Sequence, residues 1–107
     1  LLCADHVVYY GARRRIAAFA LRERLPSMYA ERQYAAAGGL LAYGATFADL
    51  FVRAAGYVDR ILKGTPPAEL PVEQPARFEL SINVGTARAL GLQIPPALRL
   101  RADTLIE

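Results

Sequence analysis

The sequence predicts an α/β fold, a parallel sheet flanked by helices. Short apolar runs alternate with segments of helical periodicity over residues 1–64, which is typical of strands joined by crossover helices. The first apolar run, residues 1–4, is unbroken, as in a strand buried on both faces of such a sheet. Finally, 107 residues with 54% apolar and 21% charged side chains suit one folded unit and exclude wholesale disorder.

The first half of the chain contains three predicted strands and two short helices. The first strand ends at Asp5, and an amphipathic helix follows from the spacing of Ala12, Ile16, Phe19 and Ala20. This helix has to end before Pro26, because proline disfavours helix in the residue that precedes it. Residues 25–30 and 40–43 are the second and third strands, and a short Ala-rich helix over residues 31–37 separates them.

The clearest helix begins after Thr46, whose hydroxyl can cap the first turn, and Asp49 in that turn complements the helix dipole. The helix is predicted to end at Lys63-Gly64, with a cation in the last turn and a glycine just past it. Its apolar residues form one wide stripe: Phe47, Leu50, Phe51, Ala54, Val58, Ile61 and Leu62.

Residues 65–75 hold four of the seven prolines and predict an extended connection, in which Glu73 is expected to pair with an arginine. Alternation of apolar and polar residues over 78–84 predicts a half-exposed strand. Residues 86–90 predict a short helix that ends at Gly91. Pro95-Pro96 is expected to open a last helix over residues 97–106.

Composition excludes several classes of protein. No apolar run is long enough to cross a bilayer, and the first residues lack the features of a secretory signal peptide. The single Cys cannot form an internal disulfide, and one Cys with one His are too few ligands for an all-protein zinc site. The net charge of +3 comes mainly from arginine, but acidic residues are interspersed, so the run Arg13-Arg14-Arg15 predicts a solvated helix face in preference to a phosphate site.

A candidate binding site lies at the carboxyl ends of the predicted strands, where ligands bind in open parallel sheets. These ends carry Asp5-His6, Tyr29 with Glu31, and Tyr43-Gly44. Tyrosine offers a flat apolar face and a hydroxyl, and aspartate can hold an ammonium or hydroxyl group. We therefore predict that Asp5, Tyr29, Tyr43 and Gly44 bind a small polar or aromatic solute, with Gly44 allowing close approach of the backbone to the ligand.

Alternatives remain open for each residue. Asp5 is equally suited to capping the next turn, Tyr29 to the core, and His6 to an exposed loop. No catalytic residue, metal site or cofactor site is predicted, because the sequence has no Gly-rich phosphate loop, no nucleophile elbow and no paired Cys.

A series of motifs supports a more specific reading. They are Leu25-Pro26-Ser27-Met28-Tyr29, Gly38-Gly39-Leu40-Leu41-Ala42-Tyr43-Gly44, Ala48-Asp49-Leu50, Tyr57-Val58-Asp59-Arg60-Ile61-Leu62-Lys63-Gly64, Pro71-Val72-Glu73-Gln74-Pro75, Phe78-Glu79-Leu80-Ser81-Ile82-Asn83, Ala87-Arg88-Ala89-Leu90-Gly91-Leu92 and Ile94-Pro95-Pro96. In this order they resemble the C-terminal part of the ABC transporter substrate-binding protein family of the tryptophan/tyrosine-binding type.

The resemblance implies a periplasmic-binding-protein-like fold of type I, with two α/β lobes joined by crossing strands and the solute between them. It also implies delivery of that solute, an aromatic or other amino acid, to an ABC permease, and a periplasmic location. Members are longer than this chain, so the chain is expected to be one incomplete unit. Residues 1–64 would be strand–helix repeats of a ligand-binding lobe, 65–76 the Pro-rich connection, and 77–107 the C-terminal strand and helices.

Three functions follow in order of preference. The first is a non-catalytic solute-binding component, whose exposed apolar surface would favour self-association of the short chain. The second is a fragment of an α/β enzyme. The third is an arginine-driven domain that binds nucleic acid or a protein partner, which requires Arg13, Arg14, Arg15, Arg22 and Arg24 on one continuous face. If the chain is a solute-binding component, no nucleic acid partner is expected.

Overall fold

The computed structural model describes residues 1–4 and 6–107, and its strands form a single sheet. The strands lie in sequence order, β1 (Leu2–Cys3), β2 (Met28–Tyr29), β3 (Leu41–Gly44), β4 (Glu79–Asn83) and β5 (Thr104–Ile106). β1, β2 and β3 are parallel to one another, and β4 is parallel to β5. The α/β fold with a mostly parallel sheet is therefore confirmed.

The pair formed by β3 and β4 is antiparallel, which the alternation of strands and helices did not predict. Gly44, the last residue of β3, lies opposite Glu79, the first residue of β4. The chain therefore leaves the sheet and re-enters it at the same edge. Residues 45–78, which connect these two strands, lie outside the sheet, and we call them the excursion.

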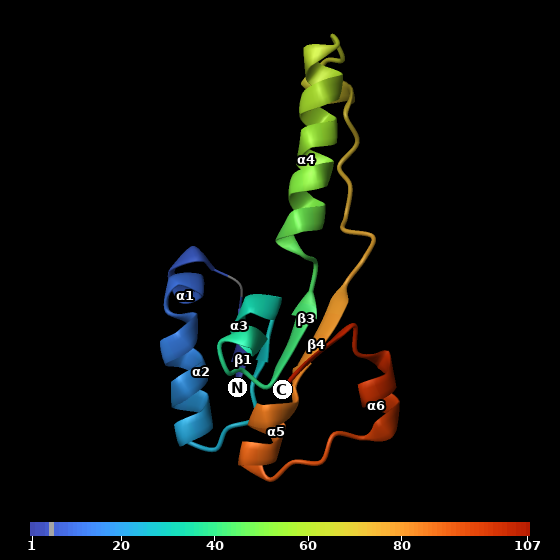
Figure 1. Cartoon of the computed structure of the whole chain (residues 1–107). Coiled ribbons are helices and arrows are strands. Elements are labelled where there is room, and N and C mark those ends of the chain that lie inside the picture. Colours follow the sequence, from blue (N-terminus) through green and yellow to red (C-terminus); the bar gives the residue numbers. More distant parts are fainter. Residues whose placement is uncertain (5) are drawn as a thin grey trace.

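Helices of two kinds surround this sheet (Figure 1). α1 (Val7–Gly11), α2 (Arg13–Arg22), α3 (Arg32–Ala36), α5 (Val84–Leu90) and α6 (Pro96–Arg101) lie around it. α4 (Phe47–Leu62) extends away from it, and residues 65–76, with the short 3-10 helix Pro67–Glu69, return alongside. The radius of gyration is 17.0 Å, against about 13 Å for a compact domain of this length.

One face of the sheet carries the core. Tyr29, Tyr34, Ala35 and Ala42 are buried together between the strands and α3. The rings of Tyr29 and Tyr34 stack at 4.7 Å between centroids. Asn83 ties β4 to this helix, because its side-chain amide donates to the carbonyl of Ala35 at 2.8 Å.

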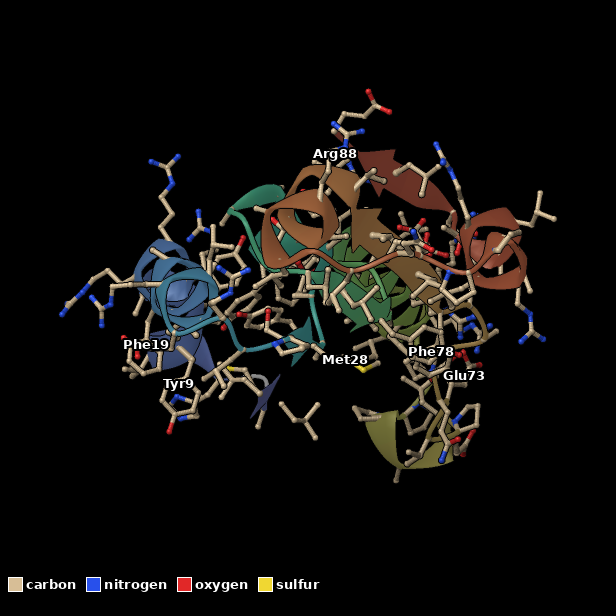
Figure 2. All side chains as sticks on the ribbon, turned by 90° about the horizontal axis from the view of Figure 1, so that it is seen from below. Tyr9, Phe19, Met28, Glu73, Phe78 and Arg88 are labelled. Carbon is tan, nitrogen blue, oxygen red and sulfur yellow. The ribbon has the colours of Figure 1, made fainter. Side chains whose placement is uncertain are left out.

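None of the described helices covers most of the other face of the sheet. Successive strand residues point to opposite faces, so Leu2, Met28, Tyr43 and Leu105 lie away from α3, and each is exposed. Figure 2 shows Met28 on the side opposite Arg88 of α5. Leu2 is 79% exposed, so the prediction that the first strand is buried on both faces is wrong for this chain.

Local sequence signals set both ends of α4 and the end of α5 as predicted, whereas α1 was not predicted and α5 begins at Val84, two residues before its predicted start. The Thr46 hydroxyl accepts from the Asp49 amide at 3.3 Å and caps α4. Glu31 and Asn83 cap α3 and α5 in the same way, and α5 ends at Gly91 in the left-handed conformation with φ 73°. The predicted pairing of Glu73 with an arginine is confirmed, since its carboxylate lies 3.4 Å from Arg53.

The prediction of a helix over residues 97–106 is confirmed for residues 97–101 and wrong beyond them. α6 ends at Arg101, and residues 104–106 form β5, parallel to β4. Asp103 fixes this turn, because its backbone amide donates to the Leu80 carbonyl at 2.9 Å and its carboxylate accepts from the Leu80 amide at 2.8 Å. Pairing with a strand more than twenty residues away overrides the helical spacing of the leucines.

The strand predicted over residues 78–84 is β4, but it is not half exposed. Ser81, Ile82 and Asn83 are all buried, on both faces of the sheet. β3 and β5 flank β4 on its two sides, so it is an interior strand.

Candidate functional site

The carboxyl ends of the first three strands enclose a hollow of about 290 Å³. Its lining comes from β1 and the residue after it, β2 and the residue after it, and the end of β3: Leu2, Cys3, Ala4, Met28, Tyr29, Ala30 and Tyr43. We call this the strand-end hollow. Parallel strands bring residues distant in sequence to one edge of the sheet, as the sequence analysis expected.

Tyr43 is the aromatic side chain of this hollow that faces solvent. It is 49% exposed and stacks on Phe78, with 5.6 Å between ring centroids and 24° between ring planes. Phe78 immediately precedes β4, so the two rings meet where the chain leaves and re-enters the sheet. The pair offers a flat apolar surface at the edge of the strand-end hollow.

Tyr29 was predicted to contact a ligand, but in the structure its ring is buried. Its side chain is 1% exposed and stacks on Tyr34, so its ring belongs to the core, which is the alternative left open by the sequence. Burial raises the pKa of the Tyr29 hydroxyl, an effect that the nearby Ser27 side chain partly opposes. Tyr29 therefore lies in the floor of the strand-end hollow with its ring almost fully covered.

The packing of the strands requires glycine at position 44, whether or not a ligand binds there. A Cβ atom at this position would collide with the carbonyl oxygen of Ala30, so the close approach that glycine allows is between β3 and the end of β2. Gly44 thus brings the β2 and β3 ends together beside Tyr43.

Asp5, the fourth predicted site residue, lies outside the described residues. Its neighbour His6 is exposed, and its Nδ1 accepts from the Val8 amide at 3.2 Å, so it caps α1. The exposed position of His6 agrees with the exposed loop expected for it from the sequence.

A second, more polar hollow of about 350 Å³ lies on the same carboxyl side of the sheet. Three carboxylates line it, from the start of α3, the first turn of α4 and the start of β4: Glu31, Asp49 and Glu79. Glu31 is 5% exposed and accepts from the Gln33 amide at 3.2 Å. Glu79 has one buried carboxylate oxygen without a hydrogen-bond partner, and its other oxygen lies 3.8 Å from Arg77.

Glu79 was not predicted as a site residue, because no local sequence signal marks it. It reaches this hollow only through the antiparallel pairing of Gly44 with Glu79, which joins segments 35 residues apart. Asp49 was recognised only as a residue that favours the helix N-terminus. The polar hollow is thus a product of the chain's return to the sheet.

The described residues contain no group of three or more His, Cys, Asp or Glu side chains able to hold a metal ion. The arginines of α2 do not form one face. Arg13 donates to the Tyr10 carbonyl and lies over the Tyr10 ring, whereas Arg15 and Arg22 line an apolar hollow with Phe19. At 100° per residue, Arg13 and Arg15 lie on opposite sides of the helix, so the continuous basic face required for nucleic-acid binding is absent from α2.

Comparison with known proteins decides the family. The model of the ABC transporter substrate binding protein family matches residues 2–106. The chain belongs to this family. No curated protein sequence matches the chain.

Solved structures show the same fold in this family. A conserved domain protein from Vibrio cholerae superposes with a TM-score of 0.91 at 27% identity, over 97% of this chain and 35% of its own. A Streptococcus pneumonia ABC domain, in complex with L-Trp, has a TM-score of 0.83 at 24% identity, over 95% of this chain and 35% of its own. A ligand-free, open substrate-binding protein with adhesive properties from Clostridium difficile has a TM-score of 0.67 at 18% identity, over 99% and 35%.

This member of the family therefore spans about a third of the length of those three structures. Among the helices described, none combines the length and apolar character needed to cross a membrane.

Proposed function

We propose that this chain forms the C-terminal part of the solute receptor of an ABC importer, and that the solute binds at the carboxyl edge of its sheet. The observation that carries the proposal is the strand-end hollow, where three parallel strands end around one depression with Tyr43 at its rim. Membership of the substrate-binding family supports a binding role.

The solute class that suits this edge is an amino acid. Tyr43 and Phe78 provide a stacked aromatic surface for an apolar or aromatic side chain. The polar hollow contributes the carboxylates of Glu31, Asp49 and Glu79, which suit an ammonium group, and Arg32 lines the same hollow. One solved neighbour holds L-Trp, which makes aromatic amino acids the first solutes to test.

The proposed role is non-catalytic, outside the cytoplasm, and depends on a permease that accepts the loaded receptor. Solute binding needs a surface complementary to the solute in shape and polarity. The aromatic pair and the carboxylates supply this surface, and no nucleophile–base pair is needed. Because the chain spans about a third of its solved relatives, the second wall of the site would come from a second lobe.

The test uses a chimera in which this chain replaces the matching third of the Vibrio cholerae protein. The chimera is screened against the twenty amino acids by thermal shift, and positives are titrated by calorimetry. We expect at least one amino acid to bind, and the Tyr43→Ala chimera to bind it more weakly. A folded chimera whose solute affinity is unchanged by Tyr43→Ala and Phe78→Ala would refute the proposed site.

A further inference from the structure

A small hollow of about 160 Å³ lies between α4 and residues 65–76, which return beside that helix (Figure 1). Its lining residues come from α4 and from the return segment: Arg53, Gly56, Tyr57, Arg60 and Glu73. At 100° per residue, the four helix positions fall within about 100° of arc, so they form one face of α4. We call this depression the arginine hollow. It shares no lining residue with the strand-end hollow or with the polar hollow.

Hydrogen bonds hold the two sides of the arginine hollow together. The Tyr57 hydroxyl donates to the Pro71 carbonyl at 2.6 Å, and Arg53 donates to the Gln74 carbonyl at 3.3 Å. Arg53 also donates to the Glu73 carboxylate at 3.4 Å. All three contacts join α4 to the return segment, so the shape of the hollow is set by this part of the chain itself.

The charges that line the arginine hollow do not cancel. The lining holds two guanidinium groups and one carboxylate, and the pair of Arg53 with Glu73 accounts for one charge of each sign. Arg60 has no ion pair in the part of the chain that the structure describes. The acid next to it in sequence, Asp59, is paired with Lys63 at 2.9 Å. The hollow therefore keeps one uncompensated positive charge, which favours an anionic ligand.

Gly56 lines the arginine hollow from the interior of the 16-residue helix α4. Glycine is the least favourable residue after proline in a helix interior, so its presence there needs a reason. Packing does not supply one, because nothing lies within 4 Å of the position that a Cβ atom would occupy. The missing side chain instead leaves open space between Arg53 and Arg60. Beside this space the Arg60 guanidinium lies 6.0 Å from the centre of the Tyr57 ring.

We propose that the arginine hollow binds a phosphate group, held by the guanidinium groups of Arg60 and Arg53 beside Gly56. Guanidinium groups present paired N–H donors that match the oxygens of a phosphate. A phosphate group carries at least one negative charge and several acceptor oxygens, so it compensates the charge of Arg60. Pockets for larger organic molecules usually exceed about 300 Å³, so a hollow of about 160 Å³ suits one small anionic group. The group is either the free ion or the phosphate of a lipid headgroup.

The test measures binding of inorganic phosphate to the full chain by phosphorus NMR, at an ionic strength held constant with sodium chloride. This method observes the ligand, so self-association of the chain does not obscure the result. We expect saturable broadening of the phosphate signal. Arg60→Gln removes the uncompensated charge and should weaken binding about tenfold or more, as expected for loss of a hydrogen bond between charged groups. Gly56→Leu fills the hollow with both arginines in place and should weaken binding as much.

Arg88→Gln is the matched control, because Arg88 is exposed on α5 and does not line the arginine hollow. This control should leave phosphate affinity unchanged within about twofold. Equal affinities of the unaltered chain, Arg60→Gln and Gly56→Leu would overturn the proposal, as would the absence of saturable broadening. Arg60 is exposed, so Arg60→Gln is expected to keep the fold, which circular dichroism checks, and this variant decides the test if Gly56→Leu does not fold.

Sedimentation with vesicles that contain phosphatidic acid distinguishes the two sources of phosphate. Vesicle binding that inorganic phosphate displaces and Arg60→Gln abolishes would support a lipid headgroup as the ligand. Binding of the free ion without vesicle binding would support the ion itself. None of these readouts uses an amino acid, so they succeed or fail independently of the proposed solute site.

Discussion

Tyr43 and Phe78 stack at 5.6 Å across the two chain segments that leave and re-enter the sheet. Tyr43 lies near the end of β3, and Phe78 immediately precedes β4. The contact therefore joins the proposed solute edge to the base of the excursion that carries α4.

Replacing Tyr43 with alanine tests whether this ring contacts solute. Loss of a contact residue at a binding site typically costs about 1–2 kcal/mol, so affinity in the chimera should fall roughly 5- to 30-fold with the melting temperature nearly unchanged. Tyr9→Ala is a matched control, because Tyr9 is 48% exposed but lies in the hollow beside α2. A sharp fall in melting temperature with constant affinity per folded molecule would make Tyr43 a structural residue only.

Substitution of Gly44 by alanine should destabilise the fold. The added methyl group meets the Ala30 carbonyl oxygen, and overpacking against backbone typically costs about 1–3 kcal/mol. Gly56→Ala in α4 is the control, because nothing lies within 4 Å of its Cβ position and alanine favours helix by about 1 kcal/mol. Urea denaturation measures both, and equal stability of the two variants would contradict the close packing at Gly44.

The buried Tyr29 hydroxyl predicts a loss of stability in alkali. Its pKa is raised in the folded chain above the ordinary value of 10.0, because burial disfavours the phenolate. Above that pH the unfolded chain releases this proton first, so the contribution is complete below pH 10 and declines as the pH rises toward the folded pKa. Tyr29→Phe should lose less stability than the unaltered chain between neutral pH and alkali, as measured by urea denaturation across this range. Parallel losses in the two proteins would contradict the assignment.

The isolated chain is expected to self-associate. The α4 stripe, the face of the sheet with Leu2 and Met28, and the apolar hollow of about 840 Å³ beside α2 are all exposed together. Sedimentation velocity at tens of micromolar should show association that grows with concentration. A clean monomer over that range would contradict the expectation.

Local sequence chemistry determined the secondary structure of the first two thirds of the chain. The Thr46 hydroxyl, the Lys63-Gly64 pair and Pro26 act within one or two turns, so each could be recognised without knowledge of the fold. The order of strands and helices then predicted three parallel strands, and parallel strands necessarily gather their ends at one edge. For this reason the location of the strand-end hollow, with Tyr43 at its rim, could be predicted from the sequence.

Tertiary structure decided which side chains at that edge can meet a solute. Tyr29 and Tyr43 look alike in sequence, but a difference of one position in the strand alternation sends one ring under α3 and the other to the open face. Residues 104–106 form β5, where a helix was predicted, because they pair with β4. Asp103 accepts a hydrogen bond from the Leu80 amide, and Ile106 lies opposite Asn83. Glu79 joined the polar hollow, and α4 left the sheet, through the same antiparallel return at Gly44. Such long-range pairing leaves no periodic signal in the sequence, because its energy comes from residues that only the folded chain brings together.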